Sequence, residues 1–445
     1  MKKYFGTDGI RGVANHFLTP ELSFKLGKVL GHKVKQLDSK NRPYVYVGKD
    51  TRLSSPLLEY SLISGFLSSG VDVKRLHQIP TPCVAYLTAS TEASLGVMVS
   101  ASHNPYYDNG IKIFSNDGMK LTDEEELELE KMIEENSSVE VINDQIGAVL
   151  NRHESMYQYI ESLYFSVKNR FDGLRIGLDC ANGSTSILAK RLFARLGATV
   201  ITINDEPNGL NINENCGATD TKQLEDLVKS SKLDLGFAFD GDGDRVIAID
   251  ELGNIIDGDF MLYVFAKHMK EEDNLRGNTV VTTVMSNMGL YKALEEENID
   301  NKSTDVGDRY VLQEMLENDY NLGGEQSGHV IMLDYNTCGD GMLVALQFTS
   351  LIVKYNMKLS ELVKDMTKYP QKLGKVVVPN KELIMNNSEY FKHIEKYNLE
   401  LGSDGRILVR PTGTEPVIRV MVEAITEELC NKYYDLAYAE LKNII

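Results

Sequence analysis

The sequence predicts an α/β protein of several domains. Its 445 residues exceed the length that one hydrophobic core supports and suggest two to four domains of ~100–200 residues each. Short apolar runs with strand character are each followed by a small or polar loop and then by a helical pattern, the order typical of α/β domains. Three such runs lie at residues 44–47, 176–178 and 280–283. Near the C-terminus, strands at 376–378, 407–409 and 417–422 precede a helix from about Glu427, which predicts a smaller α+β unit.

The loops and helices of these units follow in order from the same pattern. The three strand runs lead into the loops Gly48–Arg52, Asp179–Ser184 and Val284–Gly289. Thr122, with Glu125 three residues later, forms a capping box that predicts the start of a helix. The acidic run 123–126 then falls in the first helical turn, and we expect it to be solvated there rather than to bind metal. The apolar stretch 343–353 is interrupted by polar residues and predicts a buried core helix.

The composition is that of a globular chain with a strong acidic balance. Hydrophobic residues make up 42% and charged residues 25% of the chain. Because 47 Lys and Arg stand against 65 Asp and Glu, the net charge is −18. Such a field repels nucleic acids and anionic membrane surfaces at long range, and we expect neither as a partner. An anionic substrate therefore needs a locally cationic pocket.

Neither targeting signals nor covalent cross-links are expected. The N-terminal residues turn polar before an apolar signal-peptide core can form, and no run approaches ~18 uninterrupted apolar residues. The five cysteines are odd in number, far apart and without a Cys-x-x-Cys pair, which disfavours a disulfide framework or a zinc knuckle. We expect a cytoplasmic protein with free, buried thiols.

The strongest chemical motif is an acidic loop directly after a strand-like run. Asp240, Asp242 and Asp244 alternate with single glycines and are followed by Arg245. Three carboxylates this close repel one another unless a cation lies among them, and an all-oxygen set favours a hard ion such as Mg²⁺. An EF-hand would place an acid at Glu251 as well, but Arg245 stands where that loop needs glycine, and strand-like runs replace its helices. The loop therefore predicts a divalent metal site that is not an EF-hand.

A second motif, Ser100–Pro105, also follows an apolar strand. A hydroxyl at the end of a strand and beside His103 is placed like a nucleophile, although a serine in such a turn equally often only caps the backbone. A little further on, Lys112 can bring an ammonium group to the same site.

Two further loops carry side chains suited to ligands. Residues 410–416, with Arg419, combine two guanidinium groups, two hydroxyls and backbone N–H groups around a glycine, the inventory that phosphate binding needs. Residues 323–329 offer a carboxylate, an amide, a hydroxyl and an imidazole on a glycine-rich frame, which suits a hydroxyl-rich ligand. Each loop taken alone is also compatible with a plain surface turn.

The four loops, in this order and at these intervals, resemble those of the α-D-phosphohexomutases over nearly the whole chain. The likeness includes the segments Phe5–Gly12, Pro80–Pro82, Asn211–Thr219 and Val306–Val311. It implies four domains around a central cleft, three related α/β domains and a smaller C-terminal α+β domain. The domains expected to carry the phosphoserine, metal, sugar and phosphate loops are residues 1–150, 151–255, 256–368 and 369–445, respectively.

The resemblance also implies roles at the reacting centre. Ser102 would carry the phosphoryl group, and Mg²⁺ would be held by that phosphate together with Asp240, Asp242 and Asp244. The cations near the transferred group would be Arg11, Lys112 and Arg245. Lys112 or His103 would take the hydroxyl proton.

Away from the reacting centre, the resemblance implies two binding sets. The sugar would be bound by Glu325, Ser327 and His329. The phosphate that is not reacting would be clamped by Arg410, Thr412, Gly413, Thr414 and Arg419. Thr412 and Cys338 stand where the family often has Ser and Thr, and both keep roughly the size and hydrogen-bonding character of those residues.

The implied activity is the interconversion of glucosamine 6-phosphate and glucosamine 1-phosphate through a phosphoserine enzyme, with a hexosamine or hexose 1,6-bisphosphate as the activating intermediate. It would supply UDP-N-acetylglucosamine for cell-wall precursors. The amino-sugar branch is favoured by Gln326 in the sugar loop and by the Asn211–Thr219 segment. The expected partner is a small sugar phosphate, and the resemblance allows a homodimer. Two alternatives stay open: phosphoglucomutase or phosphomannomutase activity with the same loops, and a cation- or sugar-phosphate-binding module without turnover.

Overall fold

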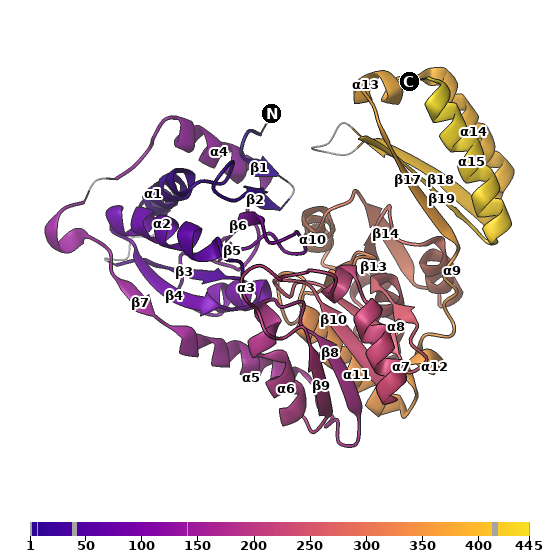
Figure 1. The fold of residues 1–445 in the computed structure, drawn as a ribbon, viewed down its shortest axis with the longest axis horizontal. Helices are drawn as coiled ribbons and strands as arrows, with labels where there is room; N and C mark the ends of the chain where they lie inside the picture. The colour runs from indigo at the N-terminus through magenta and orange to yellow at the C-terminus, as the bar shows by residue number, and fades with distance from the viewer. Residues whose placement is uncertain (1, 7, 38–41, 140, 412–416, 445) are drawn as a thin grey trace. The chain divides into compact units, whose positions relative to one another are not determined.

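The computed structural model describes residues 2–6, 8–37, 42–139, 141–411 and 417–444. These residues form four β-sheets flanked by helices (Figure 1). Packing divides the chain into two compact units, Met1–Met285 with Ile299–Lys364, and Ser286–Asn298 with Asp365–Ile445. Three of the sheets belong to the first unit and the fourth belongs to the second.

The first sheet has the strand order β1-β2-β6-β5-β3-β4-β7. Its strands are β1 (Phe5–Gly6), β2 (Gly9–Val13), β3 (Tyr44–Lys49), β4 (Asp72–Gln78), β5 (Leu95–Val99), β6 (Asp108–Phe114) and β7 (Val149–Asn151). The accompanying helices are α1 (Pro20–Leu37), α2 (Ser55–Ser68), α3 (Thr81–Ala89), α4 (Asp123–Glu134) and the short η1 (Asn143–Gln145) and η2 (His153–Ser155). Apolar residues of α1, α2 and α4 form one core with the inward side chains of the strands. Helices α1 and α2 approach closely at Gly27, where a Cβ atom would lie 2.2 Å from the Leu62 carbonyl oxygen.

The second sheet has the order β12-β11-β10-β8-β9, and β10 is parallel to β8 but antiparallel to β11. The tight turn from β10 to β11 is the acidic loop. Its strands are β8 (Arg175–Asp179), β9 (Thr199–Ile203), β10 (Leu235–Phe239), β11 (Val246–Asp250) and β12 (Ile255–Ile256). The helices of this part are α5 (Met156–Ser166), η3 (Ser184–Ile187), α6 (Ala189–Arg195), η4 (Gly217–Thr219) and α7 (Lys222–Ser231).

The third sheet has the order β14-β13-β15-β16, with β13 parallel to both of its neighbours. Its strands are β13 (Thr279–Thr283), β14 (Asp300–Thr304), β15 (Leu322–Gly324) and β16 (Val330–Met332). The helices are α8 (Gly258–Glu271), η5 (Arg276–Asn278), α10 (Asp308–Glu317), α11 (Gly341–Tyr355) and α12 (Leu359–Leu362). The hairpin between β15 and β16 carries the glycine-rich loop singled out in the sequence.

The second unit is an antiparallel sheet, β17-β19-β18, with helices packed against it. Its elements are α9 (Met288–Glu296), β17 (Gln371–Val377), α13 (Lys381–Met385), α14 (Ser388–Leu401), η6 (Gly402–Asp404), β18 (Gly405–Pro411), β19 (Val417–Ala424) and α15 (Glu427–Asn443). The predicted α+β character and the helix from Glu427 are confirmed, while β17 begins five residues before the predicted strand at 376.

Several local predictions can be compared with this fold. Thr122 and Glu125 form the predicted capping box at the start of α4, and the 343–353 stretch lies in the buried helix α11. All five cysteines are free and buried, as predicted. Among the described residues, none of the helices has the length and apolarity that crossing a bilayer requires.

The prediction that the acidic run 123–126 is solvated holds for Asp123 and Glu124, which are exposed, but is wrong for Glu126. Glu126 is only 3% exposed and forms an ion pair with Arg309 at 2.7 Å. The run lies at the start of α4, where it meets Arg309 of α10 as well as Lys2, so two of its carboxylates are used to join separate parts of the first unit. Helical periodicity gave no sign of these long-range cations.

Candidate active site

The loop between β5 and β6 places Ser102 in a fixed, buried position. Ser102 has a φ of 52°, a left-handed backbone conformation that non-glycine residues adopt rarely. The turn is held by the Ser102 N–H, which donates to Ser100 Oγ at 2.9 Å, and by Arg52 Nη2, which donates to the Ser102 carbonyl at 3.0 Å. Asn213 Nδ2 donates to the same carbonyl at 2.9 Å. The hydroxyl is thereby aimed at the acidic loop, and Ser102 Oγ donates to Asp240 Oδ2 at 2.6 Å.

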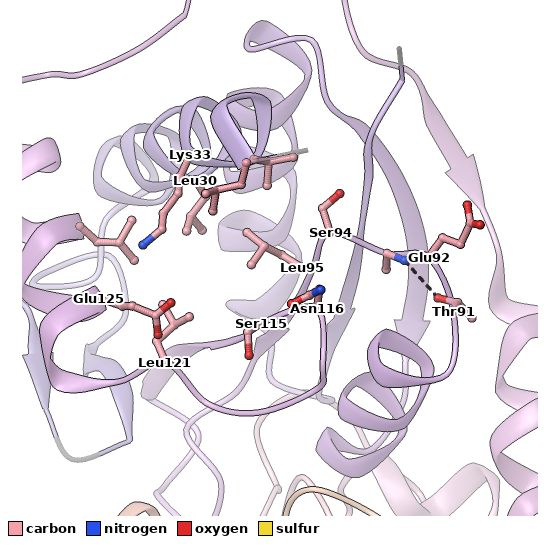
Figure 2. Close-up of a pocket in the computed structure, with 14 residues that line it drawn as sticks. Leu30, Lys33, Thr91, Glu92, Ser94, Leu95, Ser115, Asn116, Leu121 and Glu125 are labelled. Atoms are coloured by element: carbon pink, nitrogen blue, oxygen red, sulfur yellow. Dashed lines mark hydrogen bonds between the residues drawn. The ribbon is translucent and has the colours of Figure 1, made fainter. Parts of the chain in front are cut away.

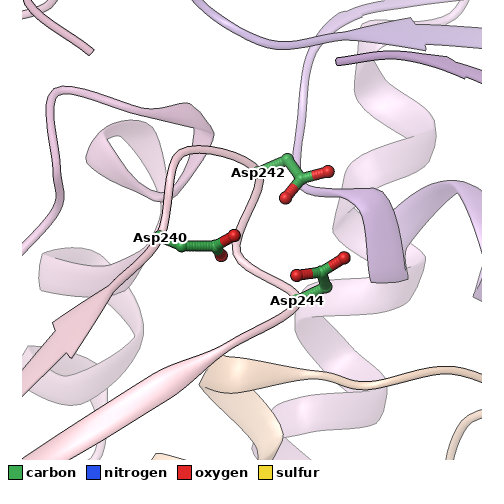
Figure 3. Close-up of side chains that lie close together, drawn as sticks. All are labelled: Asp240, Asp242 and Asp244. Atoms are coloured by element: carbon green, nitrogen blue, oxygen red, sulfur yellow. The ribbon is translucent and has the colours of Figure 1, made fainter. Parts of the chain in front are cut away.

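The acidic loop brings three buried carboxylates together (Figure 3). One oxygen from each of Asp240, Asp242 and Asp244 lies within 4.8 Å of the others. Asp242 Oδ1 and Asp244 Oδ1 are buried and have no hydrogen-bond partner among the described residues. Buried carboxylate oxygens without partners are costly, and acceptor-only oxygens in this arrangement fit a hard divalent cation. The donor set is therefore suited to Mg²⁺.

The electrostatics of the three carboxylates are unequal. Burial, followed by the neighbouring charges of Asp244 and Asp242, raises the pKa of Asp240 well above its ordinary value. Burial acts in the same sense on Asp244, but electrostatic attraction, first to Lys112 and then to His329 and Arg245, outweighs it and lowers the pKa of Asp244. Without a metal, the charged form of Asp240 is therefore less favourable than that of Asp244.

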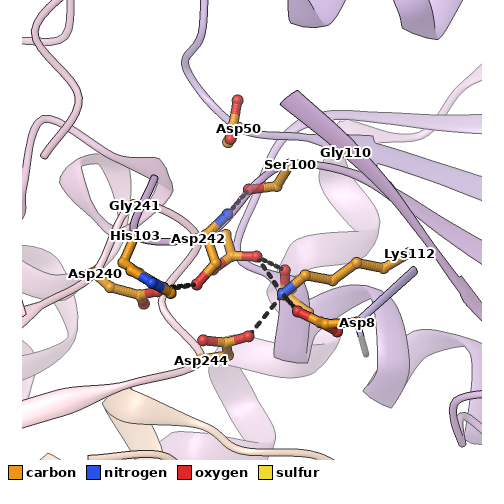
Figure 4. A network of polar contacts seen from close by, with 12 residues as sticks. Asp8, Asp50, Ser100, His103, Gly110, Lys112, Asp240, Gly241, Asp242 and Asp244 are labelled. Atoms are coloured by element: carbon orange, nitrogen blue, oxygen red, sulfur yellow. Dashed lines mark hydrogen bonds and ion pairs between the residues drawn. The ribbon is translucent and has the colours of Figure 1, made fainter. Parts of the chain in front are cut away.

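Lys112, on β6, is the central cation of the site (Figure 4). Its Nζ lies 2.7 Å from Asp244 Oδ2, 2.9 Å from Asp242 Oδ2 and 3.2 Å from Asp8 Oδ2. Burial alone would lower the pKa of Lys112, but these carboxylates raise it well above its ordinary value. Lys112 is therefore an ammonium group in this arrangement, available to offset phosphate charge.

Two arginines and one histidine border the same loop. Arg11, on β2, pairs with Asp8, and Arg245 Nε lies 4.0 Å from Asp244 Oδ1. His103 Nδ1 lies 3.4 Å from Ser102 Oγ. Burial, then the nearby Arg245 and Arg11, lowers the pKa of His103 to about 3, so the imidazole is neutral at pH 7. The two arginines, together with Lys112, create the local cationic environment that an anionic substrate needs in so acidic a chain.

The sugar-loop residues lie together at the β15–β16 hairpin. Ser327 Oγ donates to Glu325 Oε2 at 3.3 Å, and the Gly307 N–H donates to Glu325 Oε1 at 3.2 Å. His329 Nε2 lies 3.4 Å from Asp308 Oδ2. The segment before α10 and the glycine-rich hairpin therefore form one polar surface.

Comparison with known proteins places this geometry in a family. Models of domains I, II and III of the phosphoglucomutase/phosphomannomutase family, all described as α/β/α domains, match residues 2–140, 157–253 and 257–369. The model of the family's C-terminal domain matches residues 373–436. The chain belongs to the phosphoglucomutase/phosphomannomutase family. Members are mutases, a class of isomerase, and the chain is an enzyme of this class.

Similar proteins within this family include two bacterial proteins named phosphoglucosamine mutase. The one from Bacillus cytotoxicus is 52% identical over 435 residues, which cover 97% of each chain. The one from Geobacillus thermodenitrificans is 52% identical over 437 residues, which cover 98% of this chain and 97% of the relative.

Solved structures confirm the four-domain α/β fold. A phosphoglucomutase/phosphomannomutase family protein from Burkholderia thailandensis is similar with a TM-score of 0.83 at 23% identity, over 100% of this chain and 98% of that one. An N-acetylphosphoglucosamine mutase from Aspergillus fumigatus, solved with GlcNAc-6P and magnesium, has a TM-score of 0.71 at 16% identity, over 100% and 96% of the two chains.

In this mutase the predicted reacting-centre residues converge. Ser102, His103 and Lys112 of the first sheet meet the acidic loop of the second sheet, and Arg11 and Arg245 lie at its border. Of the predicted phosphate clamp, Arg410 and Arg419 are directly paired across β18 and β19 in the second unit. Thr412, Gly413 and Thr414 lie outside the described residues.

Sequence reasoning assigned no role to several residues that build the site. Asp8 and Lys120 link Lys112 to Asp308, and Thr81 Oγ1 donates to Asp242 Oδ2 at 2.5 Å. Asp8 lies within the Phe5–Gly12 segment and Thr81 within Pro80–Pro82, so both lie in segments that carry the family resemblance but show no chemical pattern of their own.

A separate cavity of about 560 Å³ lies between α1, α4 and the end of the first sheet (Figure 2). Its lining is divided about evenly between apolar and polar residues, and it includes the charged side chains of Lys33 and Glu125. None of its lining residues belongs to the predicted site.

Proposed function

We propose that this chain interconverts glucosamine 6-phosphate and glucosamine 1-phosphate. The observation that carries the phosphoryl-transfer part is the hydrogen bond from Ser102 Oγ to Asp240 at 2.6 Å, within a buried acidic triad beside Lys112. The amino-sugar part is supported by the 52% identity to proteins named phosphoglucosamine mutase over 97% of the chain.

In the proposed reaction a phosphoryl group moves from Ser102 Oγ to a free hydroxyl of the sugar phosphate. The Ser102 O–P bond breaks, a sugar O–P bond forms, and the proton of the sugar hydroxyl leaves for a nearby base while Ser102 Oγ recovers a proton. His103 lies close enough to Ser102 Oγ to move such a proton. The product of this half reaction is a sugar 1,6-bisphosphate, which turns end for end and returns its other phosphoryl group to Ser102.

The residues around Ser102 supply charge neutralisation and position. Bound Mg²⁺, held by Asp240, Asp242, Asp244 and a phosphate oxygen on Ser102, would neutralise charge on the transferring group. Lys112, Arg11 and Arg245 add fixed positive charge, which is the main contribution that phosphoryl transfer needs from a protein. Glu325, Ser327 and His329 would hold the sugar, and Arg410 with Arg419 the phosphate that does not react.

A substrate panel tests this assignment. We expect kcat/KM for glucosamine phosphate to exceed that for glucose or mannose phosphate by roughly tenfold or more, a barrier difference of ~1.4 kcal/mol. Parity among the three sugars, or a preference for mannose, would assign the chain to the phosphoglucomutase or phosphomannomutase activity instead. Intact-mass analysis of the purified enzyme should show one phosphate that is absent from Ser102→Ala.

A further inference from the structure

Asp308, the first residue of α10, has a buried carboxylate that belongs neither to the acidic triad nor to the predicted sugar-binding residues. Its side chain is 13% exposed and forms an ion pair with the ammonium group of Lys120, which lies between β6 of the first sheet and α4. His329 of the sugar loop lies 3.4 Å away on the same carboxylate oxygen. The carboxylate is therefore shared by two elements that lie far apart in the sequence.

The contacts of Asp308 place it between the sugar loop and the reacting centre. On one side, its neighbour Gly307 donates its N–H to Glu325 Oε1 at 3.2 Å. On the other side, Lys120 also binds Asp8, and Asp8 Oδ2 lies 3.2 Å from Lys112 Nζ. A chain of charged contacts thus runs from Asp308 to the cation that faces the acidic loop.

The charge state of Asp308 suits it to a cation. Burial would raise the pKa of Asp308, but Lys120 and then His329 outweigh this and lower it, so the carboxylate is ionised at neutral pH. Its present partner is a primary ammonium group, the same chemical group that a protonated 2-amino sugar carries. Glu325, the other carboxylate of this surface, already accepts from Gly307 and Ser327.

We propose that Asp308 is a specificity-determining residue that pairs with the ammonium group at carbon 2 of an amino-sugar phosphate, in place of Lys120. This inference rests on the proposed function. Lys120 keeps its second carboxylate, Asp8, when the substrate ammonium takes its place. A hydroxyl at carbon 2 can donate a hydrogen bond to Asp308 but carries no positive charge in place of the lysine's, so glucose and mannose phosphates gain far less from Asp308.

The first test is the substrate preference of Asp308→Asn. We expect kcat/KM for glucosamine phosphate to fall by roughly tenfold or more, mainly through KM, because the ion pair forms in the ground state and the transition state alike. For glucose phosphate we expect less than about a threefold change. Equal losses on both sugars would overturn the proposal, because a merely structural ion pair would affect both. Asp308→Glu, which keeps the charge, should retain the preference.

Matched controls separate this role from a purely structural one. Asp305→Asn removes an exposed carboxylate three residues earlier in the same segment and should leave both activities unchanged. Lys120→Gln breaks the same ion pair from the other side, and we expect it to keep or strengthen the preference for glucosamine phosphate. A Lys120→Gln variant that loses the preference as Asp308→Asn does would contradict the proposal.

The role of Asp308 can also be tested on the wild-type enzyme, through the pH dependence of KM. As the pH rises through the pKa of the substrate's amine, KM for glucosamine phosphate should rise several-fold while KM for glucose phosphate stays level. A constant ratio of the two KM values across that range would overturn the role of Asp308. A wild-type enzyme that turns over glucose phosphate equally well at neutral pH would instead contradict the proposed function itself.

Discussion

Ser102 combines two unusual properties for a serine, complete burial and a left-handed backbone. Its hydroxyl is the group that would carry phosphate between the two half reactions. Ser102→Ala should therefore abolish mutase turnover and remove the phosphate seen by intact mass, while the thermal unfolding midpoint stays near that of the wild type.

The neighbouring serine provides the control for this prediction. Ser100 Oγ accepts the Ser102 N–H and so positions the turn without facing the acidic triad. Ser100→Ala should keep the phosphate and lower kcat far less than Ser102→Ala does. A Ser102→Ala protein with near-wild-type activity would refute the covalent mechanism.

The acidic triad makes the folded protein sensitive to Mg²⁺. Binding to the native state alone raises unfolding free energy, by ~2.7 kcal/mol when the free ion is about 100-fold above its dissociation constant. We expect Mg²⁺ to raise the thermal unfolding midpoint of the wild type but not of Asp242→Asn, and a chelator to inactivate the enzyme. Without metal, Asp242→Asn should be about as stable as the wild type, because the repulsion that it relieves within the triad offsets the ion pair with Lys112 that it breaks.

Glu251 gives a control for the metal prediction. It stands where an EF-hand would place its last ligand, but in the structure it accepts hydrogen bonds from Ser360. Glu251→Gln should therefore leave the response to Mg²⁺ unchanged. If Mg²⁺ had no effect on the wild-type unfolding midpoint, the triad would not be a metal site.

At the scale of residues, a functional site can be predicted from the sequence when its residues lie close together along the chain. The spacing of Asp240, Asp242 and Asp244 is enough to predict a cation site. Asp8, Lys120 and Asp308, in contrast, are isolated charges in the sequence, and they become partners only when separate elements pack together. The same limit explains the error at Glu126, since its partner Arg309 lies 183 residues away. Local patterns carry no information about such pairs.

At the scale of elements, helix α11 begins on a buried acid. Asp340 caps the helix by accepting the Leu343 N–H at 3.0 Å, and it also accepts from Asn336 and from the Tyr159 hydroxyl. Burial raises the pKa of Asp340 to about 6, against an ordinary value of 3.8, and these hydrogen bonds offset the rise only in part. The native state therefore holds this proton more tightly than the unfolded chain does.

This shift has a definite sign in stability. When folding raises the pKa of an acid, the protonated acid stabilises the native state. This stabilisation is fully present at pH values below the pKa of the unfolded state and is lost as the pH rises through the pKa of the folded state. Between about pH 4 and about pH 7.5, the unfolding free energy of Asp340→Asn should gain ~2 kcal/mol relative to the wild type. Chemical denaturation at both pH values measures it, and the exposed Asp305→Asn should show no such change. A difference independent of pH would contradict the protonation of Asp340 in the folded state.

Element prediction succeeded where local signals agreed with burial. The capping box at Thr122 and the apolar content of α11 fixed two helices closely, because both signals act within a few residues. The start of β17 at Gln371 was missed because its first residues, Gln371 and Lys372, are polar and the strand is held by pairing with β19. Strand pairing of this kind overrides propensity.

At the scale of the whole molecule, the order of strands, loops and helices was enough to predict three α/β units and a smaller C-terminal α+β unit. The count of four domains came from the resemblance to a family, and the family comparison agrees with it. The order of the elements was not enough to predict how α9 packs. This helix lies in the chain between β13 and β14 of the third sheet, yet it packs with the second unit. Asn287 at its start donates to Glu423 of β19 at 3.3 Å and to the Tyr369 carbonyl at 3.1 Å.

Because α9 belongs to the second unit, the backbone crosses between the two units at 285/286, at 298/299 and at 364/365. A protease cut engineered at 364/365 would therefore produce two fragments that stay associated, since the C-terminal fragment still packs on a helix retained by the N-terminal one. The nicked protein should migrate as one species in native gels and as two in detergent. Residues 365–445 expressed alone would keep their own apolar core and the ion pair between Arg406 and Glu423, but would lose the Asn287 contact. We therefore expect that fragment to be less stable to unfolding, and the remainder of the chain added in trans to restore its stability.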